Sequence, residues 1–356
     1  MKDPSLHIRP EVRETEGYHL VTYNCRVKLN QNESPFDVPD EIKDRILEKV
    51  RSQAWSRYPE PMPKDLVEEV ARYVSVAPDR VMVANGSNSI VQHILNAIVS
   101  PGVSFVIPTP SFSLYGQFAE VLGGNPVYVP LNDNFEYDVD ALIQAAGSGV
   151  SGVIICSPNN PTGCDISNTD LTRLLESTDA IVIVDEAYAE FNDHTAIDLL
   201  DRHTNLIVLK TLSKAFGAAA IRVGCLIAHP ELVRHIHKIK LPFDINLFSR
   251  IAAIELLQHT ETIKKNVRFI IEERDRVFNA LSKIDGVKAY PSKANLILFE
   301  VDEPKNVFEQ VAEKGVLIRN LSGSPALPRG LRVSIGTKDE NNAFLRALES
   351  VMEQSQ

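Results

Sequence analysis

The chain has 356 residues, of which 44% are hydrophobic and 24% are charged. This balance is typical of globular proteins, and the length suits about two domains. The net charge of −10 at pH 7 argues against nucleic acid as the main partner, because there is no basic excess to neutralise phosphates. No apolar run is long enough to span a membrane, and the polar N-terminus lacks the apolar core of a secretory signal. We therefore expect a cytoplasmic protein without a membrane partner.

Short apolar runs alternate with amphipathic segments through the first part of the chain. After a polar N-terminal arm, strands are predicted at 27–30, 81–83, 103–107, 127–129, 152–156, 181–184, 206–209 and 223–227. Helices are predicted at 39–51, 64–75, 85–99, 112–122, 139–146 and 169–176. The alternation predicts an α/β fold with a mostly parallel sheet that helices cover on both faces. Ligands of such sheets bind at the carboxyl ends of the strands.

The pattern changes after about residue 246. Two helices are predicted within 249–284, meeting near 259–260, and further helices at 306–314 and 340–352. Strands are predicted at 287–290, 296–301, 316–319 and 331–335. This mixture predicts a smaller α+β domain. We therefore divide the chain into an arm at 1–35 that joins the small domain, a large domain at 36–245 and the small domain at 246–356.

The four cysteines are scattered along the chain without a CxxC pair. We interpret them as reduced thiols of a cytosolic protein. The nine histidines show no spacing typical of metal ligands. We therefore predict no metal site.

The segment after the predicted strand at 206–209 contains a lysine preceded by two hydroxyls. Thr211, Ser213 and Arg222 are residues that could hold an anion such as a phosphate. Lys214 could then be the nucleophilic amine of a Schiff base. A solvated surface lysine explains the segment equally well when it is taken alone.

Two further loops follow predicted strands and present an acid, a phenol and an amide. Asp185 stands at the carboxyl end of the strand at 181–184, facing the ligand crevice or capping a helix. Tyr188 follows three residues later. Asn160 lies in a proline-rich loop, where its side-chain amide could donate to an oxygen, although a plain turn is the alternative.

The remaining candidates lie on separate loops. Gly86, Ser87 and Asn88 stand at a helix N-terminus, which binds anions, unless they only cap the helix. Phe112 could stack on a flat ring or be a core aromatic, and Tyr58 could be an ordinary surface residue.

Two arginines occur in apolar segments near the C-terminus. Arg332 and Arg319 each lie in a short predicted strand, and a guanidinium suits a bidentate carboxylate partner. Outward-facing strand residues are the alternative. Together, an amine, an acid, a phenol, an amide, an anion cradle and a stacking ring fit one cofactor, pyridoxal phosphate.

Four motifs carry a resemblance to a known family. They are SPNNPTG at 157–163, DEAYAEF at 185–191, TLSKAF at 211–216 and IRVG at 221–224. In this order and spacing they resemble the fold-type I pyridoxal-phosphate aminotransferases, which implies a seven-stranded sheet and a homodimer. Within that superfamily the chain is most similar to the histidinol-phosphate aminotransferases, because it also has LNQNESPF at 29–36, RYPEP at 57–61 and GVLIRN at 315–320.

The resemblance implies a role for each candidate residue. Lys214 would form the Schiff base, Asp185 would pair with the pyridinium nitrogen, and Phe112 would stack on the ring. Tyr188 and Asn160 would donate to the phenolate oxygen. The cofactor phosphate would be held by Gly86, Ser87, Asn88, Thr211, Ser213 and Arg222, and Tyr58 would reach the cofactor of the other subunit. Asn32, Arg319 and Arg332 would bind the substrate.

The implied reaction exchanges the amino group between L-histidinol phosphate and 2-oxoglutarate, a step of histidine biosynthesis. An aromatic amino-acid aminotransferase would use the same residues with a different side-chain pocket. A decarboxylase of phosphothreonine would use the same lysine. A non-catalytic, cofactor-binding regulator is disfavoured by the acidic composition.

Overall fold

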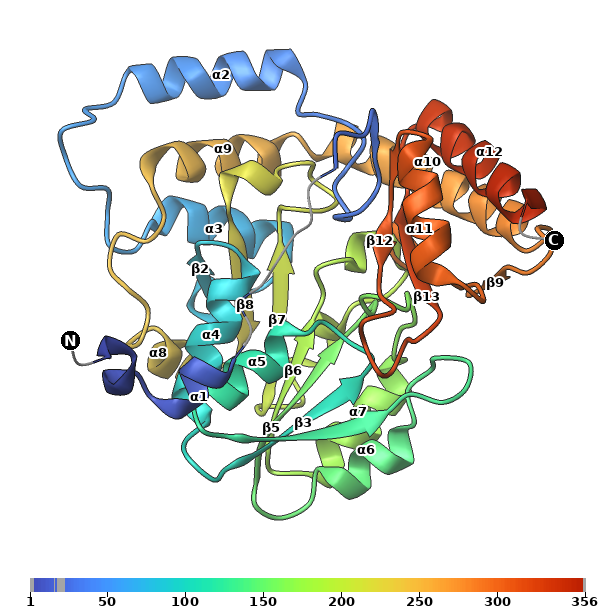
Figure 1. Cartoon of the computed structure of the whole chain (residues 1–356). Coiled ribbons are helices and arrows are strands. Elements are labelled where there is room, and N and C mark those ends of the chain that lie inside the picture. Colours follow the sequence, from blue (N-terminus) through green and yellow to red (C-terminus); the bar gives the residue numbers. More distant parts are fainter. Residues whose placement is uncertain (1–2, 16, 18–22, 355–356) are drawn as a thin grey trace.

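The computed structural model describes residues 3–15, 17 and 23–354 (Figure 1). The larger part of the molecule is built on one seven-stranded sheet, in the order β2-β8-β7-β6-β5-β3-β4. In chain order its strands are β2 (Val81–Ala84), β3 (Ser104–Thr109), β4 (Asn125–Pro130), β5 (Val150–Cys156), β6 (Ile181–Asp185), β7 (Leu206–Thr211) and β8 (Gly224–Ala228). β8 runs in the direction opposite to the other six strands, which are parallel to one another. The predicted mostly parallel sheet is confirmed.

Helices cover both faces of this sheet because its strands are apolar on both sides. Along β7, Val208 joins one buried cluster with Val70 of α3. Its neighbours Ile207 and Leu209 join a second cluster with Ile94 of α4. The helices of this part are α2 (Asp40–Arg51), α3 (Lys64–Tyr73), α4 (Ser87–Ile98), α5 (Leu114–Val121), α6 (Val139–Ala145), α7 (Asn168–Ser177) and α8 (Pro230–Ile236). Each agrees with a predicted helix to within a few residues, except α8.

The C-terminal part, apart from its first helix, forms an α+β layer on one side of the molecule (Figure 1). Its antiparallel sheet has the order β12-β13-β10-β9. The strands are β9 (Lys288–Ala289), β10 (Leu296–Glu300), β12 (Arg319–Asn320) and β13 (Gly330–Ser334). The helices are α9 (Leu247–Gln258), α10 (Thr260–Leu281), α11 (Pro304–Glu313) and α12 (Lys338–Gln354).

The single strand predicted at 316–319 is divided between two sheets. β11 (Val316–Leu317) pairs in parallel with β1 (Val27–Lys28), whereas β12 pairs with β13. One apolar run cannot show that its pairing partner changes midway. The pairing of β1 places the end of the N-terminal arm against the C-terminal part of the chain.

The division at residues 245 and 246 stays a prediction. α9 follows that boundary, yet it packs against α2 and α3 beside the seven-stranded sheet. Within the arm, the described residues include α1 (Pro10–Glu14), which contacts α5, while residues 16 and 18–22 lie outside the described part. No helix in the described part of the chain is long and apolar enough to cross a membrane.

Candidate active site

A cleft of about 1660 Å³ opens at the carboxyl ends of the parallel strands. Thirteen of the predicted site residues line it: Asn32, Ser87, Asn88, Phe112, Asn160, Asp185, Tyr188, Thr211, Ser213, Lys214, Arg222, Arg319 and Arg332. Two predicted residues do not, Gly86 and Tyr58. The fold therefore gathers side chains from both ends of the sequence into one cavity.

Lys214 lies between the large sheet and the N-terminal arm. Its Nζ donates a hydrogen bond of 3.0 Å to the carbonyl oxygen of Gln31 and lies 5.8 Å from the centre of the Tyr188 ring. Burial lowers the pKa of the Lys214 ammonium to about 8, and the positive charges of Arg332 and Arg222 act in the same direction. About a tenth of this amine is therefore neutral and nucleophilic at pH 7, far more than for an ordinary lysine.

Asp185 ends β6 and is buried. Its Oδ2 accepts a hydrogen bond of 2.7 Å from the Tyr115 hydroxyl, and its Oδ1 accepts one of 3.0 Å from the backbone N–H of Ala187. Burial raises the pKa of Asp185, and these two hydrogen bonds oppose that shift. The carboxylate is thus oriented into the cleft by a tyrosine from α5.

The role of Tyr115 was not predicted from the sequence. The Phe112 ring lies edge-on to the Tyr115 ring, with centroids 5.4 Å apart. Both face the same cleft. The signal in the sequence was the spacing of three residues between Phe112 and Tyr115 at the start of the predicted helix, which places both side chains on the same face of a helix.

The predicted anion cradle is assembled from two turns. Arg222 has a left-handed backbone, with φ of 53°, and its Nη1 donates to the Ser213 hydroxyl at 3.2 Å. The Thr211 hydroxyl donates to the same oxygen at 2.9 Å. A Cβ atom at Gly86, where φ is 80°, would collide with Arg222 Nη2. The positive φ favours glycine here, and a side chain at this position would displace the end of the Arg222 guanidinium.

Arg332 is held by contacts from distant parts of the chain. Its Nη1 donates to Asn160 Oδ1 at 2.5 Å, and its Nη2 donates to the Asn30 carbonyl oxygen at 2.7 Å. Arg319 stands opposite Arg332 across the antiparallel pair β12 and β13. Both arginines line the cleft, so this side of the cavity is cationic.

Asn32 connects the N-terminal loop to both parts of the molecule. Its Nδ2 donates to the Tyr188 hydroxyl at 2.9 Å, and its Oδ1 accepts from the Ser334 hydroxyl at 3.0 Å. The residue is buried and has a φ of 54°, a conformation that asparagine tolerates better than most residues. Asn32 thereby fixes the direction of the Tyr188 phenol.

Tyr58 lies outside the cleft and is 84% exposed. Its ring stacks on Phe243, with centroids 4.9 Å apart. Trp55 and Phe248 form a second exposed aromatic pair, 5.2 Å apart. Tyr58 thus makes no contribution to the cleft of its own chain.

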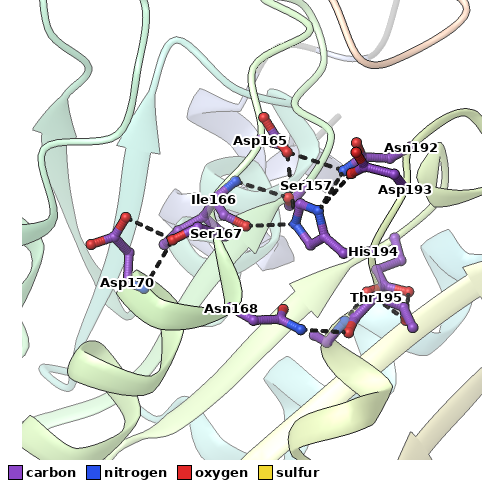
Figure 2. A network of polar contacts seen from close by, with 12 residues as sticks. Ser157, Asp165, Ile166, Ser167, Asn168, Asp170, Asn192, Asp193, His194 and Thr195 are labelled. Carbon is purple, nitrogen blue, oxygen red and sulfur yellow. Dashed lines mark hydrogen bonds and ion pairs between the residues drawn. The ribbon is translucent and has the colours of Figure 1, made fainter.

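The loop that carries Asn160 is braced by a polar network (Figure 2). The Ser157 hydroxyl accepts from the backbone N–H of Ile166 at 3.1 Å. His194 Nε2 lies 3.0 Å from the Ile166 carbonyl oxygen, and Asn192 Nδ2 donates to Asp165 Oδ2 at 3.1 Å. The network ties this loop to the segment after β6, and the backbone N–H of Ser157 donates to the Asp185 carbonyl oxygen at 3.0 Å.

This donor set fits pyridoxal phosphate. The pKa of the Lys214 amine is lowered, and Asp185 supplies a buried carboxylate. Gly86 has no side chain to displace the Arg222 guanidinium. A metal ion has no comparable site, since the described residues contain no group of three or more His, Cys, Asp or Glu side chains that could hold one.

Comparisons with known proteins agree with this chemistry. The family model Aminotransferase class I and II matches residues 26–348. The histidinol-phosphate aminotransferase of Chlorobaculum tepidum is 39% identical over 341 residues, covering 94% of this chain and 98% of that protein. The protein of the same name from Caldanaerobacter subterraneus subsp. tengcongensis is 37% identical, with 97% and 98% covered.

Solved structures share the fold. The histidinol-phosphate aminotransferase from Sinorhizobium meliloti, in complex with pyridoxal-5'-phosphate, has a TM-score of 0.89 at 21% identity, with 98% of both chains covered. The L-threonine-O-3-phosphate decarboxylase from Porphyromonas gingivalis has a TM-score of 0.82 at 23% identity, with 92% of this chain and 99% of that chain covered. At these identities the likeness shows the fold alone.

Proposed function

Because the chain belongs to the aminotransferase class I and II family and is a pyridoxal-phosphate-dependent aminotransferase, we propose that its amino donor is L-histidinol phosphate. The acceptor in this proposal is 2-oxoglutarate, and the products are imidazole-acetol phosphate and L-glutamate. The step belongs to histidine biosynthesis. The observation that carries the proposal is the name shared by the full-length relatives.

Lys214 is proposed as the catalytic residue. Bound pyridoxal phosphate supplies an electron sink for the electrons released at the substrate Cα. Lys214 Nζ holds the cofactor before the substrate arrives and afterwards moves the proton of the substrate Cα. Its lowered pKa, about 8, suits both tasks, because each requires a neutral amine.

The other cleft residues orient the cofactor in this proposal. Asp185 keeps a positive charge on the pyridine nitrogen, while Tyr188 and Asn160 donate to the phenolate oxygen. Phe112 packs against the ring. The phosphate is bound by Gly86, Ser87, Asn88, Thr211, Ser213 and Arg222, which together offer hydroxyls, a guanidinium and the N-terminus of α4.

The cationic side of the cleft is proposed to bind the substrate. Arg332 and Arg319, with Asn32 between the two parts of the molecule, face a phosphate on one substrate and a carboxylate on the other. A guanidinium binds both anions through paired N–H groups. The hydrogen bonds of Arg332 to Asn160 and Asn30 hold its plane in place.

We also propose a homodimer in which Tyr58 reaches the cofactor phosphate of the other subunit. The support is that Tyr58 is exposed and lies outside its own cleft, next to an exposed aromatic surface. Mixing a Lys214→Ala variant with a Tyr58→Ala variant should restore activity, since one site of each mixed dimer has both residues. Failure to restore activity would count against a shared site.

A cytoplasmic location is proposed as well. All four cysteines are free thiols, which is the usual state in a reducing compartment.

One experiment separates the proposed activity from its alternatives. The purified protein with pyridoxal phosphate and 2-oxoglutarate is given histidinol phosphate, phenylalanine or phosphothreonine, and glutamate and carbon dioxide are measured. Glutamate formed fastest from histidinol phosphate supports the proposal. Glutamate formed fastest from phenylalanine would make the protein an aromatic aminotransferase, and carbon dioxide from phosphothreonine would make it a decarboxylase.

A further inference from the structure

Three charged side chains are buried together behind the ends of β6 and β7. Lys210 Nζ lies 3.0 Å from Glu186 Oε2 and 3.2 Å from Glu190 Oε1. We call these three residues the Lys210 cluster. Each is at least partly buried, and Lys210 is only 9% exposed. A lysine at this depth is unusual unless it is paired.

The cluster lies on the opposite face of the sheet from the cofactor residues. Glu186 follows Asp185 in the chain, and Lys210 precedes Thr211; successive strand residues point to opposite faces. Asp185 and Thr211 line the large cleft. Lys210 and Glu190 do not line that cleft but border a small cavity beside Val70 of α3, which Thr211 also reaches. Each residue of the cluster on β7 or directly after β6 is therefore one peptide bond away from a residue that lines the cleft.

The cluster also ties several segments together. Glu186 accepts hydrogen bonds from the Thr195 hydroxyl at 2.7 Å and from the backbone N–H of Ala196 at 2.5 Å. The backbone N–H of Glu186 donates to the carbonyl oxygen of Leu209 on β7 at 2.9 Å. Glu190 belongs to the turn η3 (Ala189–Phe191). Lys210 therefore joins β7 to the chain that leaves β6.

The charges of the cluster do not balance, because two carboxylates share one ammonium. Burial lowers the pKa of Lys210, but Glu190 and Glu186 together outweigh burial and raise it, so the lysine stays charged. The other titratable groups that face it are Tyr73 of α3 and Cys225 of β8, both buried or nearly so and both raised in pKa. The cluster thus places net negative charge behind the cofactor site.

The negative charge of the cluster acts on the Asp185 carboxylate. The negative charge of Glu186 is one of the causes that raise the pKa of Asp185, after burial; the opposing groups include Tyr115 and Lys214. Lys210 offsets part of the charge of Glu186. Removing Lys210 would leave two buried carboxylates without their cation, a change that is costly in protein interiors.

We propose that Lys210, through Glu186 and Glu190, is a positioning residue that holds Asp185 and the Thr211–Lys214 segment in register and sets the electrostatic potential at the bound cofactor. The proposal rests on the function proposed above. It assigns the cluster no contact with the cofactor or substrate, since Lys210, Glu186 and Glu190 do not line the cleft.

The test compares two variants that change the charge of the cluster in opposite directions. Lys210→Met makes the region more negative, and Glu190→Gln makes it less negative. The midpoint of the pH titration of the bound cofactor, read from its visible absorbance, should rise in the first variant and fall in the second. We expect shifts of about half a pH unit, because one added or removed charge acts on the bound cofactor through a partly screened protein interior.

Cofactor affinity provides the second measurement. Titration of the apoprotein with pyridoxal phosphate should show binding weakened on the order of tenfold in Lys210→Met, as when outer partners are removed from metal sites. Lys210→Arg keeps the positive charge and should restore both the affinity and the titration midpoint. If Lys210→Met does not fold, the downward shift in Glu190→Gln still tests the proposal.

A matched control separates positioning from stability. Lys49 forms an ion pair with Glu255, which is 2% exposed, between α2 and α9. Lys49→Met should lower the melting temperature without moving the cofactor titration. Unchanged midpoints in Lys210→Met and Glu190→Gln would overturn the proposal. A wild-type protein that fails to bind pyridoxal phosphate would instead overturn the function on which it rests.

Discussion

The hydrogen bond from Tyr115 to Asp185 gives a quantitative prediction for Tyr115→Phe. The hydroxyl is buried and lies 2.7 Å from Asp185 Oδ2. The substitution removes one oxygen atom and keeps the ring that packs against Phe112. It therefore removes the hydrogen bond to the carboxylate, together with the contact of the same hydroxyl with the Cys156 thiol, and leaves the packing of α5 intact.

The expected effect follows from the strength of this bond. A hydrogen bond to a charged group contributes about 1.5–3 kcal/mol, so its loss raises the pKa of Asp185 by roughly one to two units. Burial already raises the pKa of Asp185 and the Tyr115 hydrogen bond lowers it. Loss of that hydrogen bond therefore raises the pKa of Asp185 further. As the pH is lowered, Asp185 in the Tyr115→Phe apoprotein therefore becomes protonated at a higher pH than in the wild-type apoprotein.

The assay is the affinity for pyridoxal phosphate as a function of pH. The cofactor's pyridinium nitrogen pairs with the anionic form of Asp185, so affinity declines as the pH falls through the pKa of that carboxyl. In Tyr115→Phe this acid limb should lie at a pH about one unit or more above its wild-type position. The apoprotein should also be less stable near neutral pH, and this deficit should shrink as Asp185 becomes protonated.

Tyr137→Phe is the matched control. The Tyr137 hydroxyl donates to the carbonyl oxygen of Cys156 at 2.5 Å, and the residue does not line the cleft. Its loss should cost about 1 kcal/mol of stability and leave the acid limb in place. If the acid limb of Tyr115→Phe coincides with that of wild type, the assignment of Tyr115 to Asp185 is refuted.

Three further predictions concern other parts of the site. Covalent capture of pyridoxal phosphate by the apoprotein should accelerate about tenfold per pH unit up to the Lys214 pKa of about 8 and then level off; a flat profile would contradict the lowered pKa. Gly86→Ala should weaken binding of the cofactor at least about tenfold through its clash with Arg222, but should spare pyridoxal, which has no phosphate. Gly102 also has a positive φ but has open space around it, so Gly102→Ala should leave cofactor affinity unchanged. Arg332→Lys should raise the KM for the phosphorylated donor roughly 10–100-fold because the paired N–H groups are lost, and an unchanged KM would remove Arg332 from the substrate site.

The order of helices and strands could be read from the sequence because it depends on local periodicity. The apolar runs of β5, β6 and β7 alternate with amphipathic helices, and such an alternation has few possible arrangements. The carboxyl ends of parallel strands meet at one edge. For this reason Asp185, Asn160 and Lys214 could be predicted to lie near one another without any knowledge of their contacts.

Contacts between distant segments could not be predicted in this way. Arg332 contacts Asn30 and Asn160, and Lys214 contacts Gln31, because the N-terminal loop passes between the two parts of the molecule. Such pairings depend on how sheets pack against each other, and no local pattern encodes them. The division of 316–319 between two sheets was missed for the same reason.

The sequence by itself determined the kinds of groups in the site and the cofactor that they fit, since each group lies on a short motif whose chemistry is local. Only the tertiary structure decided which of those groups act through others. Tyr115 orients Asp185 although 70 residues separate them in the chain. The Lys210 side chain lies on the face of the sheet opposite the cleft, although Lys210 is only four residues before Lys214. A side chain's direction and burial depend on strand alternation and on the helices that cover each face, and these are fixed only when the whole chain is packed.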